Sequence, residues 1–435
     1  MDTMVTIHRL GKLRNKGAPG PPTLRRWLLQ RAEEVVTKDP YVRTRECSNA
    51  MWAAVQLQEE CRGVGAAALR RAEQRAAEAN PRDVGSLLWA AARLRVEDRE
   101  SLRAVEVIAK RGTEVVEGMN PRDLANSLWA LARLQVSPHL PESQKMYNAM
   151  SAEVRKDPGR LEADCTNVLW SFAKLSVEPA TSTKLLNFMH MDPKGQKQLQ
   201  SQELLQSSAV IWVCGTLGTD LALAVALQVC KIVLASPQRG CEPSSVVNIL
   251  WGLAHLAARD PVVDRIREWG LKIGLQLFNK FTTQQVANFV WALSKLDGPV
   301  DHQVVEAMMR ASSAAEERHA EFQTQELVNV FVAVARTVTR CEQRAVVDPL
   351  KFTVLDKLSP IVLARLRSGG GTDHDLAEFM RGLRLVNADI ASSGEALAEL
   401  LPQGDALRSS GGNRTGSLAW SCFRLDLPQH LCAPM

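Results

Sequence analysis

This sequence of 435 residues has few tyrosines, no long apolar run and no paired cysteine spacing. A membrane-spanning helix needs about 20 apolar residues, so we expect no membrane span and no signal-peptide core. The nine cysteines follow neither a disulfide nor a zinc pattern, which predicts reduced structural thiols in an intracellular compartment. The two tyrosines and an abundance of Ala, Leu, Arg and Glu favour helices over strands.

The chain also lacks a strong charge of either sign and any arrangement typical of an enzyme. Its net charge is +5, and because the first 45 residues carry ten Lys or Arg against four acids, the remainder is close to neutral. A nucleic-acid site must therefore be a localised basic surface. The eight histidines are scattered, and the Ser368–Gly371 loop lacks the lysine and strand of a phosphate loop. We expect no enzyme, no catalytic residue, no metal and no cofactor.

What the chain does contain is a repeat marked by tryptophan. Eight of its ten tryptophans fall on one column, with steps of 37 to 42 residues over its first seven members. Val332 and a degenerate position near Arg381 continue the column before its last member. The column consists of Trp52, Trp89, Trp129, Trp170, Trp212, Trp251, Trp291 and Trp420. A period near 40 is typical of stacked helical repeats.

Residues 120–136 show how each repeat begins. Asn120 is a natural N-cap, Pro121 suits the first helical position, and Asp123 can bond back to the cap. Two helices of about 15 residues with two turns complete the period, so each repeat is a helical hairpin that must stack on its neighbours. We therefore expect an all-α fold, a right-handed α-solenoid of about ten hairpin repeats of roughly 40 residues.

The repeat pattern also divides the chain. Residues 1–22 read as a basic flexible N-terminal arm or transit remnant, and residues 23–45 as an N-terminal capping helix. Residues 46–367 hold repeats one to eight. Residues 368–435 hold a glycine-rich insertion and two degenerate C-terminal capping repeats, with no added nuclease-like module.

Further columns accompany the tryptophan on the first helix of each repeat, the A helix. The position three residues before the tryptophan and the position four residues after it are seven residues apart, so both lie on one stripe of the helix. The residue that follows the tryptophan, which is mostly small, lies between them on this stripe. The Asn column, three before, includes Asn126, Asn167, Asn248, Asn288 and Asn329. The basic column, four after, includes Arg93, Arg133, Lys174, His255, Lys295 and Arg336.

Each column has a structural and a functional interpretation. We assign the tryptophans mainly to packing between repeats, because burying an indole is worth more than stacking a base on it. The asparagines can brace neighbouring helices or contact a ligand. The basic column can track a phosphate backbone or merely suit the helix dipole. A variable column six before the tryptophan, which includes Asp123, Gln206 and Gln285, can read base edges or cap the helix.

The segments at 125–134 (ANSLWALARL) and 287–296 (ANFVWALSKL) resemble the signature helix of the octotricopeptide-repeat family. Related helical repeats occur in FAST-kinase-like proteins and in the mitochondrial RNA-editing substrate-binding complex. The resemblance covers about residues 46–430. It implies an α-solenoid that binds single-stranded RNA in a mitochondrion or plastid and acts in transcript stability, processing, editing or translation. It also implies other organellar RNA-processing or ribosomal proteins as partners.

Two alternatives remain open from the sequence. An armadillo-like scaffold could bind an extended peptide, although here the asparagine precedes the tryptophan by three residues. A structural subunit of an organellar ribonucleoprotein complex would make fixed, unspecific contacts to RNA and protein.

Overall fold

The computed structural model describes residues 3–14, 21–57, 62–137, 140–176, 179–235, 241–341 and 344–386. These residues form helices and turns, and no strand occurs among them. None of the described helices is both long and apolar enough to cross a bilayer. The chain divides into two compact units, Met1–Ser201 and Gln202–Met435, which we describe separately.

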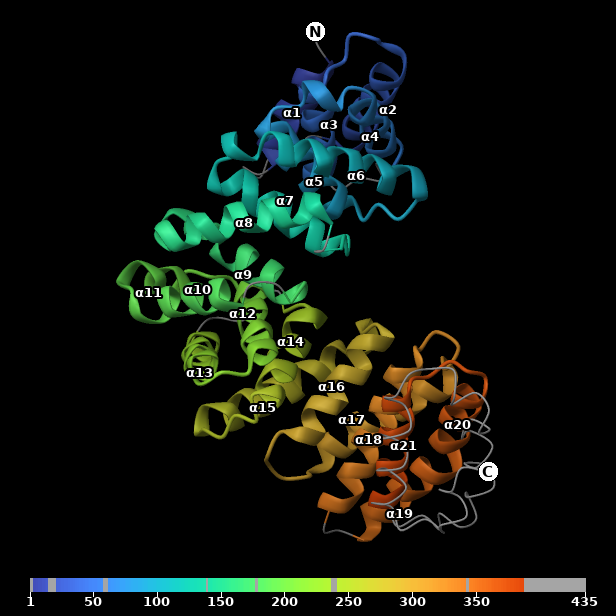
Figure 1. Ribbon diagram of the computed structural model, residues 1–435. Coiled ribbons are helices and arrows are strands. Elements are labelled where there is room, and N and C mark those ends of the chain that lie inside the picture. Colours follow the sequence, from blue (N-terminus) through green and yellow to red (C-terminus); the bar gives the residue numbers. More distant parts are fainter. Residues whose placement is uncertain are drawn as a thin grey trace, which may run out of the picture. The chain divides into compact units, whose positions relative to one another are not determined.

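In the N-terminal unit, each helix packs on the one after next in the chain, so that A helices contact A helices and second (B) helices contact B helices (Figure 1). The A helices are α1 (Thr3–Arg14), α3 (Thr44–Leu57), α5 (Pro81–Leu94), α7 (Pro121–Arg133) and α9 (Cys165–Lys174). The B helices are α2 (Pro22–Lys38), α4 (Arg62–Gln74), α6 (Arg99–Glu114), α8 (Pro141–Lys156) and α10 (Pro179–Met191), followed by the additional helix α11 (Pro193–Gln200). Short 3-10 turns, η1 (Ala76–Glu78), η2 (Val116–Gly118) and η3 (Pro158–Asp164), follow α4, α6 and α8.

The C-terminal unit repeats this arrangement. Its A helices are α12 (Leu204–Leu217), α14 (Pro243–His255), α16 (Thr283–Lys295), α18 (Thr324–Arg340) and α21 (Asp373–Leu385). Its B helices are α13 (Asp220–Ala235), α15 (Pro261–Leu277) with the 3-10 turn η4 (Phe278–Lys280), α17 (His302–Glu317), and the run α19 (Arg344–Phe352), π-helical η5 (Thr353–Leu358) and α20 (Ser359–Arg367). The all-α fold and its helical repetition are confirmed.

The A helices start where the sequence predicts. The Asn120 side chain accepts a hydrogen bond from the Asp123 backbone at 2.9 Å, and Pro121 occupies the first turn. Asn80 caps α5 in the same way with Asp83. These caps satisfy backbone N–H groups that a helix leaves without partners, so each repeat begins at a defined residue.

The residue after each tryptophan packs against a neighbouring A helix, which corrects its predicted place on the polar stripe. Ala53, Ala90, Ala130 and Ala292 are fully buried. At the contact of α12 with α14, a Cβ on Gly215 would lie 2.6 Å from the Gly252 Cα. The position is small because successive A helices meet there at close range.

The A helices end in a recurrent left-handed turn. The sixth residue after the tryptophan has positive φ in five successive repeats: Arg95, Gln135, Ser176, Gly218 and Ala257. In three of them the next residue bonds back to the carbonyl five residues earlier, a Schellman closure. This turn directs the chain from the A helix toward the B helix.

One segment that the sequence predicted to be irregular is helical. Residues 3–14 form α1, which packs on α3, where the sequence predicted a flexible arm. In the repeat of α9 and α10, Asp192 caps the additional helix α11. The predicted last repeat, with Trp420, lies outside the described residues.

Candidate nucleic-acid interface

The tryptophans of the column lie at the surface edge of the A helices. All seven that the structure describes, from Trp52 to Trp291, are half-buried. The Trp212 and Trp251 rings stack with centroids 5.8 Å apart and planes inclined by 22°. Packing therefore leaves part of each indole accessible.

The basic column crosses these rings. The Arg93 guanidinium carbon lies 5.5 Å from the centroid of its own Trp89 and 5.2 Å from that of Trp129 in the next repeat. His255 lies between Trp251 and Trp291 in the same way, at centroid distances of 3.7 and 4.6 Å. A planar or cationic group thus lies between the indoles of two neighbouring pairs, Trp89 with Trp129 and Trp251 with Trp291, an arrangement that cation–π attraction favours where the group is charged.

Most side chains of the basic column are open to solvent. Arg93, Arg133, Lys174, His255 and Lys295 are exposed, and within the described residues no carboxylate forms an ion pair with any of them. Burial, with Arg95 and Arg93 nearby, lowers the pKa of Arg133. We define the Trp, Asn and basic columns together as the tryptophan stripe.

Arg336 is the exception in the basic column. Its Nη2 lies 3.7 Å from Glu378 Oε2, and the two side chains are only 14% and 16% exposed. Glu378 also pairs with Arg381 at 2.8 Å. Val332, which replaces the tryptophan in this repeat, is buried, so the stripe loses its accessible aromatic and its free cation at α18.

The Asn column carries amides without protein partners. Asn126, Asn167, Asn248, Asn288 and Asn329 are half-buried. Within the part of the chain that the structure describes, their side chains form no hydrogen bond to another residue. They therefore form no hydrogen-bonded brace between neighbouring helices among the described residues.

The variable column serves helix capping. Gln206 and Gln285 accept hydrogen bonds from the backbones of Glu203 and Thr282 at 3.1 and 3.0 Å. Asp123 is buried at the start of α7, and burial raises its carboxyl pKa. Since these side chains are engaged at the helix start, we do not include them in the stripe.

His255 is held in a defined tautomer. Its Nδ1 lies 3.0 Å from the Trp251 carbonyl oxygen, which can only accept, so Nδ1 carries the proton. Burial and the nearby Lys295 lower the pKa of His255, and the hydrogen bond to the Trp251 carbonyl raises it. The lowering effects are larger. The imidazole is therefore neutral at pH 7.

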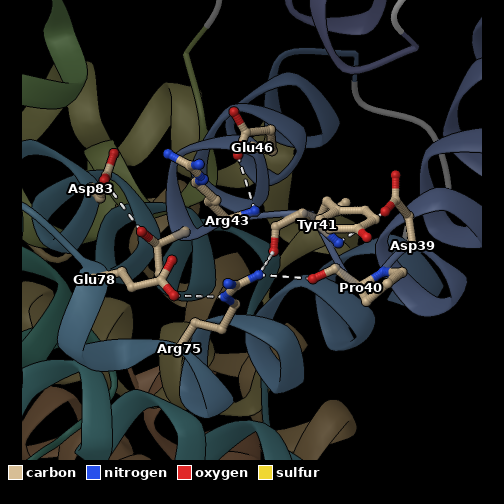
Figure 2. A network of polar contacts seen from close by, with 10 residues as sticks. Asp39, Pro40, Tyr41, Arg43, Glu46, Arg75, Glu78 and Asp83 are labelled. Carbon is tan, nitrogen blue, oxygen red and sulfur yellow. Dashed lines mark hydrogen bonds and ion pairs between the residues drawn. The ribbon is translucent and has the colours of Figure 1, made fainter.

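A second set of basic residues, which the sequence analysis missed, caps the B helices. We call these contacts the B-helix clasps: each donor bonds a carbonyl at the end of the preceding B helix or in the turn after it. Arg75, for example, bonds the Pro40 and Val42 carbonyls at 2.8 and 3.2 Å and Glu78 at 2.8 Å (Figure 2). The donors are Arg71, Arg75, Arg111, Lys145, Lys184, Arg310 and Arg365. Basic residues recur along the second helices of successive repeats, and this recurrence in the sequence could have indicated the clasps.

The described residues contain no group of three or more His, Cys, Asp or Glu able to hold a metal ion. Asp375, which follows His374 in the sequence, forms the capping box of α21 with Thr372. The comparisons with protein-family models and with curated proteins found no match to this chain.

Proposed function

We propose that this protein binds single-stranded RNA along the tryptophan stripe. The observation that carries the proposal is the placement of the basic column across successive indoles, as Arg93 lies across Trp89 and Trp129. Within each of the two compact units, each such repeat adds an aromatic surface and a positive charge to the face that its A helices share. Sequence-tolerant binding of single strands combines these two elements, because bases stack on aromatic rings and cations attract the phosphates.

The spacing of the repeats supports an extended ligand. Packed helices lie about 8–10 Å apart, so neighbouring cations of the stripe can follow a phosphate backbone. A single strand suits this surface because its bases are free to stack, whereas those of a duplex are paired.

The resemblance to octotricopeptide repeats extends this proposal. It suggests a right-handed solenoid of about ten repeats that acts on transcripts in a mitochondrion or plastid, together with other RNA-processing proteins. Stability, processing, editing and translation of the transcript are all compatible with a binding surface that carries no chemistry of its own.

Fluorescence anisotropy with a labelled single-stranded RNA pool tests the proposal. The folded protein should bind the pool at low salt and lose affinity as salt rises. Combined Arg133→Gln, Lys174→Gln and Lys295→Gln should weaken binding by more than about tenfold without lowering the melting temperature.

The matched control is combined Lys110→Gln and Lys272→Gln, which removes exposed charges from the B helices α6 and α15. This variant should bind RNA nearly as the wild type does. Absence of RNA binding by the folded wild type, or equal losses in both variants, would refute the proposal. Binding of an extended peptide in place of RNA would favour the armadillo-like alternative.

A further inference from the structure

The gap between Trp251 and Trp291 is shaped for a flat ring. His255 fills it, with centroid distances of 3.7 and 4.6 Å to the two indoles. The imidazole plane is inclined by 33° to Trp251 and by 32° to Trp291, and at these separations it contacts both indoles, so the gap holds one aromatic ring. A purine base is as flat as the imidazole and contains an imidazole ring itself, so it can replace His255 without moving α14 from α16.

Two amides stand one helical turn from the tryptophans that form this gap. Asn248 on α14 lies three residues before Trp251, and Asn288 on α16 lies three residues before Trp291. Both side chains are half-buried and form no hydrogen bond to another described residue. They can therefore bond the edge of a base held between the indoles.

The chemistry of an asparagine amide selects among the bases. Adenine offers N6–H as a donor and N7 as an acceptor on one edge, which match the amide oxygen and NH2. The corresponding edge of guanine has two acceptors, O6 and N7, so one partner of the amide is lost. Uracil also offers a donor and an acceptor, but its single ring covers less of the two indoles than a purine does.

We propose that the gap between Trp251 and Trp291 binds an adenine base of single-stranded RNA, which displaces the His255 imidazole and is read by Asn248 and Asn288. The proposal rests on the proposed function and adds base selectivity to it. His255 gives up its hydrogen bond to the Trp251 carbonyl and turns outward, next to the phosphate of the bound nucleotide.

The test compares oligoadenylate, oligouridylate and oligocytidylate of equal length, with affinity from anisotropy and stacking from quenching of tryptophan fluorescence. The wild type should bind oligoadenylate about tenfold more tightly than the pyrimidine oligomers. Combined Asn248→Ala and Asn288→Ala should weaken oligoadenylate binding most and reduce this ratio to about twofold or less. Alanine is a better helix former than asparagine, so the variant should fold.

Two further variants make the test specific. Asn279→Ala removes an exposed asparagine in η4 and should keep the full preference for oligoadenylate. His255→Ala empties the gap, so at about pH 7.5 the preference for oligoadenylate over oligouridylate should be as large as in the wild type or larger. A smaller preference would show that the imidazole does not give way to a base.

The outcomes separate the two proposals. If the wild type binds no oligomer and no RNA pool, the proposed function itself fails. If it binds all oligomers equally, or prefers a pyrimidine, only the adenine proposal is overturned. A preference for oligoadenylate that survives the double asparagine variant would also overturn it.

Discussion

The A helices and B helices of this protein carry similar basic residues in different surroundings. On the A helices, Lys295 lies against an indole, with its Nζ 5.6 Å from the Trp291 centroid, and is exposed to solvent. On the B helices, Arg75 bonds two carbonyls and a carboxylate. Backbone carbonyls at a helix end lack intrahelical partners, so an arginine there stabilises the fold, whereas a cation over an indole keeps its charge available to a ligand. Three predictions, each with a control variant, test this difference between the A helices and the B helices.

The largest effect should come from a clasp. Arg75→Ala removes charge-assisted hydrogen bonds to Pro40 and Val42 and should lower the free energy of unfolding by about 1.5–3 kcal/mol, as measured by urea denaturation. Its RNA affinity should stay unchanged. Arg70→Ala is the control, because this arginine is 52% exposed and its ion pair with Glu100 is 3.6 Å long. It should cost less than about 0.5 kcal/mol. Equal losses would mean that the clasp adds nothing to an ordinary surface charge.

A smaller effect should come from the end of the stripe. Glu378→Gln removes the carboxylate that holds Arg336 and Arg381, so RNA binding at low salt should tighten by about two- to fivefold, a change that raised salt abolishes. Glu316→Gln removes the carboxylate paired with Lys357 at 2.9 Å on a B helix and should leave affinity nearly unchanged. The same gain in both variants would indicate a general charge effect.

The smallest effect should be a pH dependence at His255. Because the folded protein holds this pKa below the ordinary value of 6.5, the unfolded chain binds the proton more readily, and stability should fall slightly as pH drops below about 6.5. A phosphate favours the charged imidazole, so RNA binding should tighten between about pH 7.5 and 5.5.

His255→Gln should reduce both pH dependences, as measured by thermal denaturation and anisotropy across this range. His302→Gln, which alters an exposed histidine of α17, should leave them as in the wild type. If the wild type and His255→Gln share one pH profile, His255 does not contribute to it.

The helical pattern of this chain was predictable because its signals are local. Asn120, Pro121 and Asp123 start α7 through bonds within one turn, and such bonds are visible in a few consecutive residues. How far the tryptophans are buried, and how closely the residue after the tryptophan packs, depend instead on how neighbouring A helices approach each other. The position of Gly252, for instance, is decided by a helix about 40 residues earlier.

The site was partly predictable for the same reason. The basic column was recognised from its spacing, but the pairing of Arg336 with Glu378 joins residues of different repeats. The variable column looked like a sequence code because Asp, Gln, Ser and Glu alternate there. Several of these side chains cap the helix start, as Gln206 and Gln285 do, and that task tolerates changes of residue type.

The left-handed turn that follows five successive A helices shows what these repeats share. Five different residue types occupy it, and only Gly218 is free of the steric cost that a Cβ brings, about 1 kcal/mol for each of the other residues. The backbone path is therefore common to these repeats although the side chain is not. Because the turn lies inside the hairpin, between its A helix and its B helix, the connection within a hairpin tolerates a change of residue type without a change of backbone path.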